Sequence, residues 1–179
     1  MFETNGARWM SAALVALTLS MQSTYAEDVG KSAFTMTAIS NVAMGEKVVA
    51  GEYDAVIARL ASPAGRSVEA YSRYTNLCVA YTKSGELDAA EESCEKAVTI
   101  AGRRHSLIPT YSFRSGRRDK AVALSNRGVL RAVKGNVLGA ERDFHEATNL
   151  TAALEAPRVN LDHLRNGVAQ TARLSNAEK

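Results

Sequence analysis

The chain carries one pattern twice, and this internal repeat restricts the fold more than any other feature of the sequence. When Asn76 is aligned with Asn126, small residues and a glycine recur at the same places. The identical pairs are Asn76/Asn126, Val79/Val129, Gly85/Gly135, Ala90/Ala140, Glu91/Glu141 and Ala97/Ala147. Small residues at helical spacing on both sides of a turn glycine are typical of stacked helical hairpins. Such arrays usually hold other molecules rather than transform them, so the repeat predicts a binding module.

Hydrophobic periodicity extends this prediction along the chain. Tyr74, Leu77, Cys78 and Tyr81 fall at i, i+3, i+4 and i+7 and form one apolar stripe of a helix. The predicted helices cover residues 42–50, 52–62, 67–83, 86–101, 120–134, 137–153 and 157–174. We expect a lead-in over residues 27–41 that is either extended or the start of a helix, an inserted loop over 105–120, and a flexible tail over 175–179. The helical domain then spans residues 42–174.

Residues 1–26 have the anatomy of a secretory signal peptide. Arg8 ends a short polar start, an apolar run follows, and the small residues Thr24 and Ala26 occupy the positions that a signal peptidase reads. The apolar run is shorter than the roughly 20 residues that a bilayer span needs. An uncleaved anchor or an ordinary core helix is the alternative. We therefore expect export, with cleavage after Ala26.

Composition excludes one class of partner. The formal net charge is +3, which is too small to predict nucleic-acid binding. Apolar residues make up 46% of the chain and there are only 3 prolines, a balance that fits a helical protein with small-residue interfaces.

The repeated residues resemble the tetratricopeptide repeat, a helix-turn-helix unit of about 34 residues. Its signature positions can be aligned with residues 71–104 and again with residues 121–154. The first set is Tyr74, Leu77, Cys78, Tyr81, Gly85, Ala90, Cys94 and Ala97; the second is Leu124, Arg127, Gly128, Arg131, Gly135, Ala140, Phe144 and Ala147. Cys78 and Cys94 replace the usual glycine and aromatic residue, and Arg127 and Arg131 replace the usual leucine and tyrosine. The resemblance implies an α-solenoid of about three such hairpins plus a C-terminal capping helix. The pattern is also similar to that of small exported tetratricopeptide proteins of Gram-negative bacteria, which implies a periplasmic location.

The two cysteines, Cys78 and Cys94, lie almost equally far from the turn at Gly85. Residues placed in this way face one another across an antiparallel hairpin, and exported proteins meet oxidising conditions. We predict a disulfide between them, worth roughly 3 kcal/mol in the chain-entropy model. Two free buried thiols are the alternative.

In tetratricopeptide arrays the first helix of each hairpin lines a concave groove that holds the partner. By that resemblance, the partner-binding residues here are Ser72, Thr75, Asn76, Val79, Lys83, Ser125, Asn126, Val129 and Val133. The amides of Asn76 and Asn126 can both donate to and accept from a peptide backbone. The alternative is that these asparagines merely occupy exposed helix positions.

A second candidate surface is basic. It consists of Arg103, Arg104, Arg114, Arg117, Arg118 and Lys120, around the predicted loop. Guanidinium groups suit an acidic protein or an anionic lipid or polymer of the cell envelope. A solvated loop explains the same residues.

No catalytic or metal-binding constellation is visible. His105, His145 and His163 are isolated, and no nucleophile elbow or phosphate-binding glycine loop occurs. We therefore expect no enzyme activity and no cofactor. The leading hypothesis is a periplasmic interaction module that binds a segment of another protein through the groove. The alternative is an envelope assembly factor that self-associates or contacts anionic lipid or polymer through the basic surface.

Overall fold

In the computed structural model, the described residues are 33–107 and 112–177, and every regular element among them is a helix. In chain order these are α2 (Gly45–Val49), α3 (Tyr53–Leu60), the 3-10 helix η1 (Pro63–Ser67), α4 (Ala70–Ser84), α5 (Leu87–Leu107), α6 (Ser112–Val133), α7 (Val137–Leu150) and α8 (Ala156–Ala177). The predicted all-α class is confirmed for this part of the chain. The predicted signal peptide, residues 1–26, lies outside the described residues.

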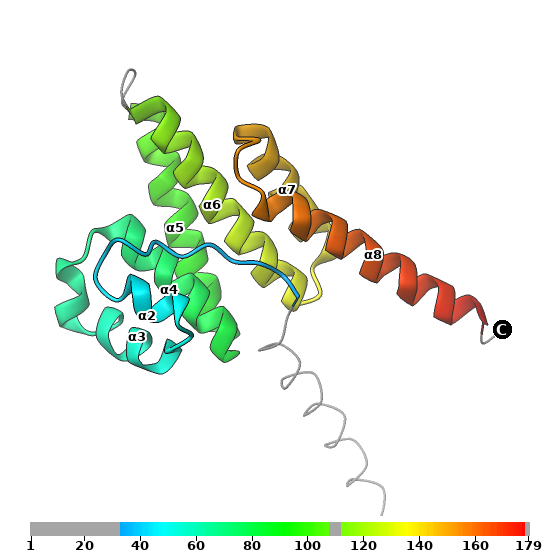
Figure 1. The fold of residues 1–179 in the computed structure, drawn as a ribbon, viewed down its shortest axis with the longest axis horizontal. Coiled ribbons are helices and arrows are strands. Elements are labelled where there is room, and N and C mark those ends of the chain that lie inside the picture. Colours follow the sequence, from blue (N-terminus) through cyan, green and yellow to red (C-terminus); the bar gives the residue numbers. More distant parts are fainter. Residues whose placement is uncertain (1–32, 108–111, 178–179) are drawn as a thin grey trace, which may run out of the picture.

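The helices pack in chain order, each one against the next, from α4 to α8 (Figure 1). In addition, α4 contacts α6 and α6 contacts α8. The alternate helices α4, α6 and α8 therefore form one layer, to which α5 and α7 are joined as returning helices.

Glycines and side-chain caps set the hairpin turns. Gly85 and Gly135 have φ of 80° and 78°, a left-handed backbone that glycine adopts without a steric penalty. Glu69 caps the start of α4 by accepting bonds from the backbone N–H groups of Tyr71 and Ser72. Asn136 caps α7 by accepting from the N–H of Gly139. Both turn glycines lie where the repeat predicts them.

Small residues let paired helices approach closely. Ala90, Ala97, Ala140 and Ala147 are each no more than 1% exposed. Gly128 of α6 packs directly against an aromatic ring, since a Cβ added there would lie 2.6 Å from a ring carbon of Phe144. The repeated alanines and this glycine therefore act as contact points between helices, as the sequence pattern predicts.

The prediction of an inserted loop over residues 105–120 is wrong for the described part of that range. Helix α5 continues to Leu107 and α6 already begins at Ser112. A glycine inside a helix costs only about 1 kcal/mol, which tertiary packing readily offsets. That packing is visible at Gly116, which is buried, and at Asp119, whose carbonyl accepts a hydrogen bond from the Tyr71 hydroxyl at 2.9 Å.

The last helix is longer than predicted and differs in its buried face. The sequence offers Val159, Leu161, Leu164 and Val168 as apolar positions of this helix, and we predicted a flexible tail from residue 175. Leu161 and Leu164 are each 7% exposed, whereas Val159 and Val168 are 39% and 47% exposed, and the helix runs to Ala177. The buried stripe includes a polar residue instead, the fully buried Asn160.

The lead-in, whose conformation the sequence left open, forms no helix or strand over residues 34–39. We call residues 33–39 the N-terminal segment. It crosses the layer of α4, α6 and α8 before the chain turns into α2 (Figure 1).

Candidate functional site

The most specific arrangement of polar groups in the protein is a row of three asparagines that bind the N-terminal segment. Asn126 on α6 accepts a bond from the Thr37 N–H at 2.8 Å and donates its amide to the Thr37 carbonyl at 2.9 Å. Asn76 on α4 does the same with Ile39, at 2.8 and 3.0 Å. The third asparagine, Asn160 on α8, binds Thr35 at 2.8 and 2.7 Å. We call Asn76, Asn126 and Asn160 the asparagine ladder.

The ladder forms hydrogen bonds with both the N–H and the carbonyl group of every second residue of the segment. A primary amide carries both a donor and an acceptor, so it can satisfy one peptide N–H and one carbonyl at once. Residues bound at i, i+2 and i+4 are typical of an extended chain, whose side chains alternate between two faces. All three ladder residues are 0% exposed, so the interpretation of Asn76 and Asn126 as exposed, indifferent positions is wrong.

Asn160 was missed as a site residue by the sequence reasoning. A usable signal existed, because Asn126 and Asn160 are separated by one tetratricopeptide repeat length of about 34 residues. The repeat in the sequence is defined by small residues and turn glycines, and α8 supplies only the first helix of a hairpin.

The alternate side chains of the segment pack into apolar surroundings. The ring of Phe34 lies 6.3 Å from that of Phe144 and 5.5 Å, edge to face, from that of His163. Met36 packs against three neighbouring groups of buried residues, including those around Val129 and Leu130. Ala38 packs beside the cluster of buried residues formed by Val48, Val56, Leu60, Leu77, Val79 and Ala80. The segment is thus held by backbone bonds from Thr35, Thr37 and Ile39 and by apolar contacts from the residues between them, and the Ile39 side chain adds contacts to the buried cluster around Tyr71.

Several other predicted groove residues also meet the segment. Val79, Val129 and Val133 belong to the apolar clusters against which it packs. Lys83 donates a long, 3.4 Å bond to the Phe34 carbonyl, and its burial lowers the pKa of the ammonium group.

The remaining hydroxyl residues of the predicted groove, Ser72, Thr75 and Ser125, are also buried. The Ser72 hydroxyl donates to its own helix cap, Glu69, at 3.0 Å. Thr75 and Ser125 are 0% exposed, and their hydroxyl oxygens have no hydrogen-bond partner among the described residues.

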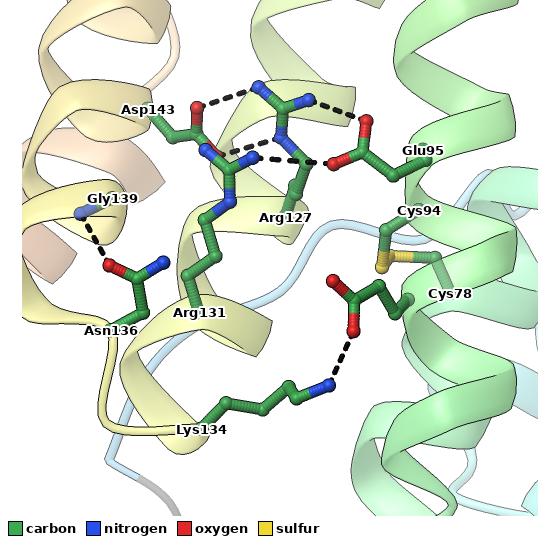
Figure 2. Close-up of polar contacts among 10 residues, drawn as sticks. Cys78, Cys94, Glu95, Arg127, Arg131, Lys134, Asn136, Gly139 and Asp143 are labelled. Atoms are coloured by element: carbon green, nitrogen blue, oxygen red, sulfur yellow. Dashed lines mark hydrogen bonds and ion pairs between the residues drawn. A yellow bond between two sulfur atoms is a disulfide. The ribbon is translucent and has the colours of Figure 1, made fainter.

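An ion-pair network links α6 to its two neighbouring helices, α5 and α7. Figure 2 shows Arg127 and Arg131 of α6 between Glu95 of α5 and Asp143 of α7. Arg127 binds Asp143 through two bonds of 2.8 Å and Glu95 through a third of 2.8 Å, and Arg131 reaches Asp143 at 3.0 Å.

The network supplies carboxylate partners to Arg127 and Arg131, at positions where the resemblance predicts leucine and tyrosine. The Asp143 side chain is 1% exposed, and bidentate Arg–carboxylate geometry compensates its desolvation. Burial alone would lower the pKa of Arg127, but its bonds to Asp143 and Glu95 outweigh burial and raise the pKa. The guanidinium therefore stays charged inside the helix layer.

Cys78 and Cys94 form the predicted disulfide between α4 and α5 (Figure 2), with sulfur atoms 2.06 Å apart and Cα atoms 4.8 Å apart. Neither thiol is free, so this pair offers no nucleophile. Its role is to hold the first complete hairpin together.

The predicted basic surface is partly engaged with the protein itself. Arg117 donates to the Asn149 carbonyl at 3.4 Å, and Lys120 pairs with Glu146 at 2.8 Å. Arg103 and Arg118 are exposed. The side chains of Arg104 and Arg114 lie outside the described residues.

A separate hollow of about 360 Å³ lies between the α3–η1 corner and the α4–α5 hairpin. Arg73 and Lys96 line it, and both stack on the Tyr74 ring, at 4.6 and 5.0 Å from its centroid. The described residues that line the hollow include no histidine or cysteine.

Two further features bear on function. Within residues 33–107 and 112–177, no helix has the length and apolar character that crossing a bilayer requires. The same part of the chain does not bring three or more His, Cys, Asp or Glu side chains together as a metal site would need.

Comparison with protein-family models, with curated proteins and with solved structures gives no match for this chain.

Proposed function

We propose that the chain is a tetratricopeptide-like α-solenoid that acts as a non-catalytic, periplasmic protein–protein interaction module. Its groove is the face of α4, α6 and α8 that carries the asparagine ladder, and its ligand is an extended segment of another protein. The observation that carries this proposal is the ladder itself. Three buried amides, each bonded to both backbone groups of one residue, are suited to holding an extended peptide of any origin.

The packing order supports the solenoid part of the proposal. Successive helices from α4 to α8 pack against one another, and α4, α6 and α8 adjoin in one layer, as the first helices of stacked hairpins do. Asn76, Asn126 and Asn160 then hold equivalent positions in three successive units. The Cys78–Cys94 disulfide supports the export part, because such bonds persist in oxidising compartments.

The test is copurification of a defined partner from the native host. The double variant Asn76→Ala/Asn126→Ala should lose the partner while keeping its helical circular dichroism. Asn166→Ala, an exposed asparagine of α8 outside the ladder, is the matched control and should retain it. Undiminished partner recovery with the double variant would overturn the proposal.

The basic surface gives the second candidate, an envelope factor that binds anionic lipid or polymer. The engagement of Arg117 and Lys120 with Asn149 and Glu146 weakens this alternative. It predicts that Arg117→Ala/Arg118→Ala abolishes partner recovery and that added salt weakens binding. The groove proposal predicts neither.

A further inference from the structure

We propose that the N-terminal segment is a resident ligand of the groove, and that a partner enters by displacing it with a segment of the same pattern. That pattern is an aromatic, a long aliphatic and a small side chain at alternate positions, as in Phe34, Met36 and Ala38. This inference rests on the proposed function and adds to it the chemistry of the partner and the way in which access is controlled.

The backbone contacts do not discriminate between sequences. The ladder binds Thr35, Thr37 and Ile39 through their N–H and carbonyl groups only. Any residue except proline presents the same two groups, so these contacts hold an extended chain without selecting its side chains.

Selection comes from the residues between them. Phe34 contacts two rings, Met36 lies where three buried clusters meet, and Ala38 sits against the cluster that contains Val79. A shift by one residue would turn Phe34 and Met36 away from the apolar face and put two threonines among the three side chains that replace them. The groove therefore selects both the side chains of the bound segment and the register in which that segment binds.

Two features make the segment suited to exchange. Its apolar side chains are only partly buried, and Thr35 is exposed. An incoming chain can therefore replace the contacts of the segment one residue at a time. The turn into α2 is also strained, because Met44 has φ of 67°, a left-handed backbone that non-glycine residues rarely adopt. A Cβ at Gly45 would lie 2.3 Å from the Ile39 carbonyl oxygen, so this turn is tight while the segment is docked.

The experiment uses the full chain and a fluorescein-labelled peptide of residues 33–40. The control peptide has the same composition, but Phe34 exchanges places with Thr35 and Met36 with Thr37. The key variant is Thr37→Pro, which removes the N–H that donates to Asn126 and leaves every apolar residue in place. Ala33→Pro is the matched control, because Ala33 precedes the three residues that the ladder binds.

Thr37→Pro should bind the labelled peptide at least about tenfold more tightly than the wild type, a change equivalent to about 1.4 kcal/mol. Ala33→Pro should bind it like the wild type. Phe34→Ala, which weakens the resident segment through its side chain, should also tighten binding. Adding Asn126→Ala to Thr37→Pro should remove the gain, and the control peptide should not bind.

Two results would overturn the inference without touching the proposed function. The first is binding that depends on Asn126 but is no tighter in Thr37→Pro and Phe34→Ala than in the wild type. The second is equal binding of the two peptides. Peptide binding that is unchanged by Asn126→Ala would instead contradict the groove as a binding surface, and with it the proposed function.

Discussion

Replacement of Asp143 by alanine should lower the free energy of unfolding by about 3–5 kcal/mol, the usual cost of removing one partner from a buried ion pair. The Asp143 side chain is 1% exposed and accepts two bonds of 2.8 Å from Arg127. Its removal leaves the Arg127 side chain, which is 14% exposed, with Glu95, whose side chain is 47% exposed. The expected loss is a large share of the roughly 5–15 kcal/mol by which typical domains are stable.

The assay is urea denaturation followed by circular dichroism, with the free energy extrapolated to water. Glu155→Ala is the control, because the side chains of Glu155 and Arg158 are 76% and 61% exposed and their 3.2 Å pair is open to water. That variant should change stability by less than about 1 kcal/mol. The double variant Arg127→Met/Asp143→Leu should recover most of the loss, since an apolar pair leaves no buried charge. Equal costs for Asp143→Ala and Glu155→Ala would refute the reasoning.

Reduction of the Cys78–Cys94 disulfide should lower the free energy of unfolding by roughly 3 kcal/mol, because the bond closes a loop in the unfolded chain. A thiol titration of the denatured, unreduced protein should find no thiol, and two thiols would contradict the bond. Gly128→Ala should cost about 1–3 kcal/mol, because its Cβ would lie 2.6 Å from an aromatic ring carbon. Gly102→Ala, whose Cβ would meet nothing within 4 Å, should not destabilise. Burial lowers the pKa of Lys83 below 10.5, so the unfolded chain binds more protons than the folded one between that lowered value and 10.5. Stability relative to Lys83→Met should therefore rise with pH across this window in urea titrations, and a flat difference would count against it.

Local sequence signals predicted the parts of the fold that local physics determines. The turn glycines Gly85 and Gly135 adopt the left-handed backbone, and Cys78 meets Cys94 across the first of these turns. Such features depend on residues close in sequence, where period and turn chemistry can be recognised directly. The sequence predicted that the amides of Asn76 and Asn126 bind the backbone of a partner. That partner stays a prediction, and in the structure the two amides bind Thr37 and Ile39 of the same chain.

What the sequence left open depends on distant contacts. Asn126 and Thr37 are 89 residues apart, and Asn160 and Thr35 are 125 apart. No local pattern links them, although the alternation of apolar and polar residues from Phe34 onward is typical of an extended chain. The predicted loop over 105–120 failed for a related reason, because packing against neighbouring helices outweighs the weak helix preference of glycine.

The backbone amide of Thr37 tests the central claim most directly, through residue-specific hydrogen exchange measured by NMR. If the ladder holds an extended chain, this amide exchanges slowly in the wild type, and Asn126→Ala accelerates its exchange more than Asn160→Ala does. Asn160→Ala should in turn act most strongly on the amide of Thr35. Fast exchange of both amides in the wild type would contradict the account.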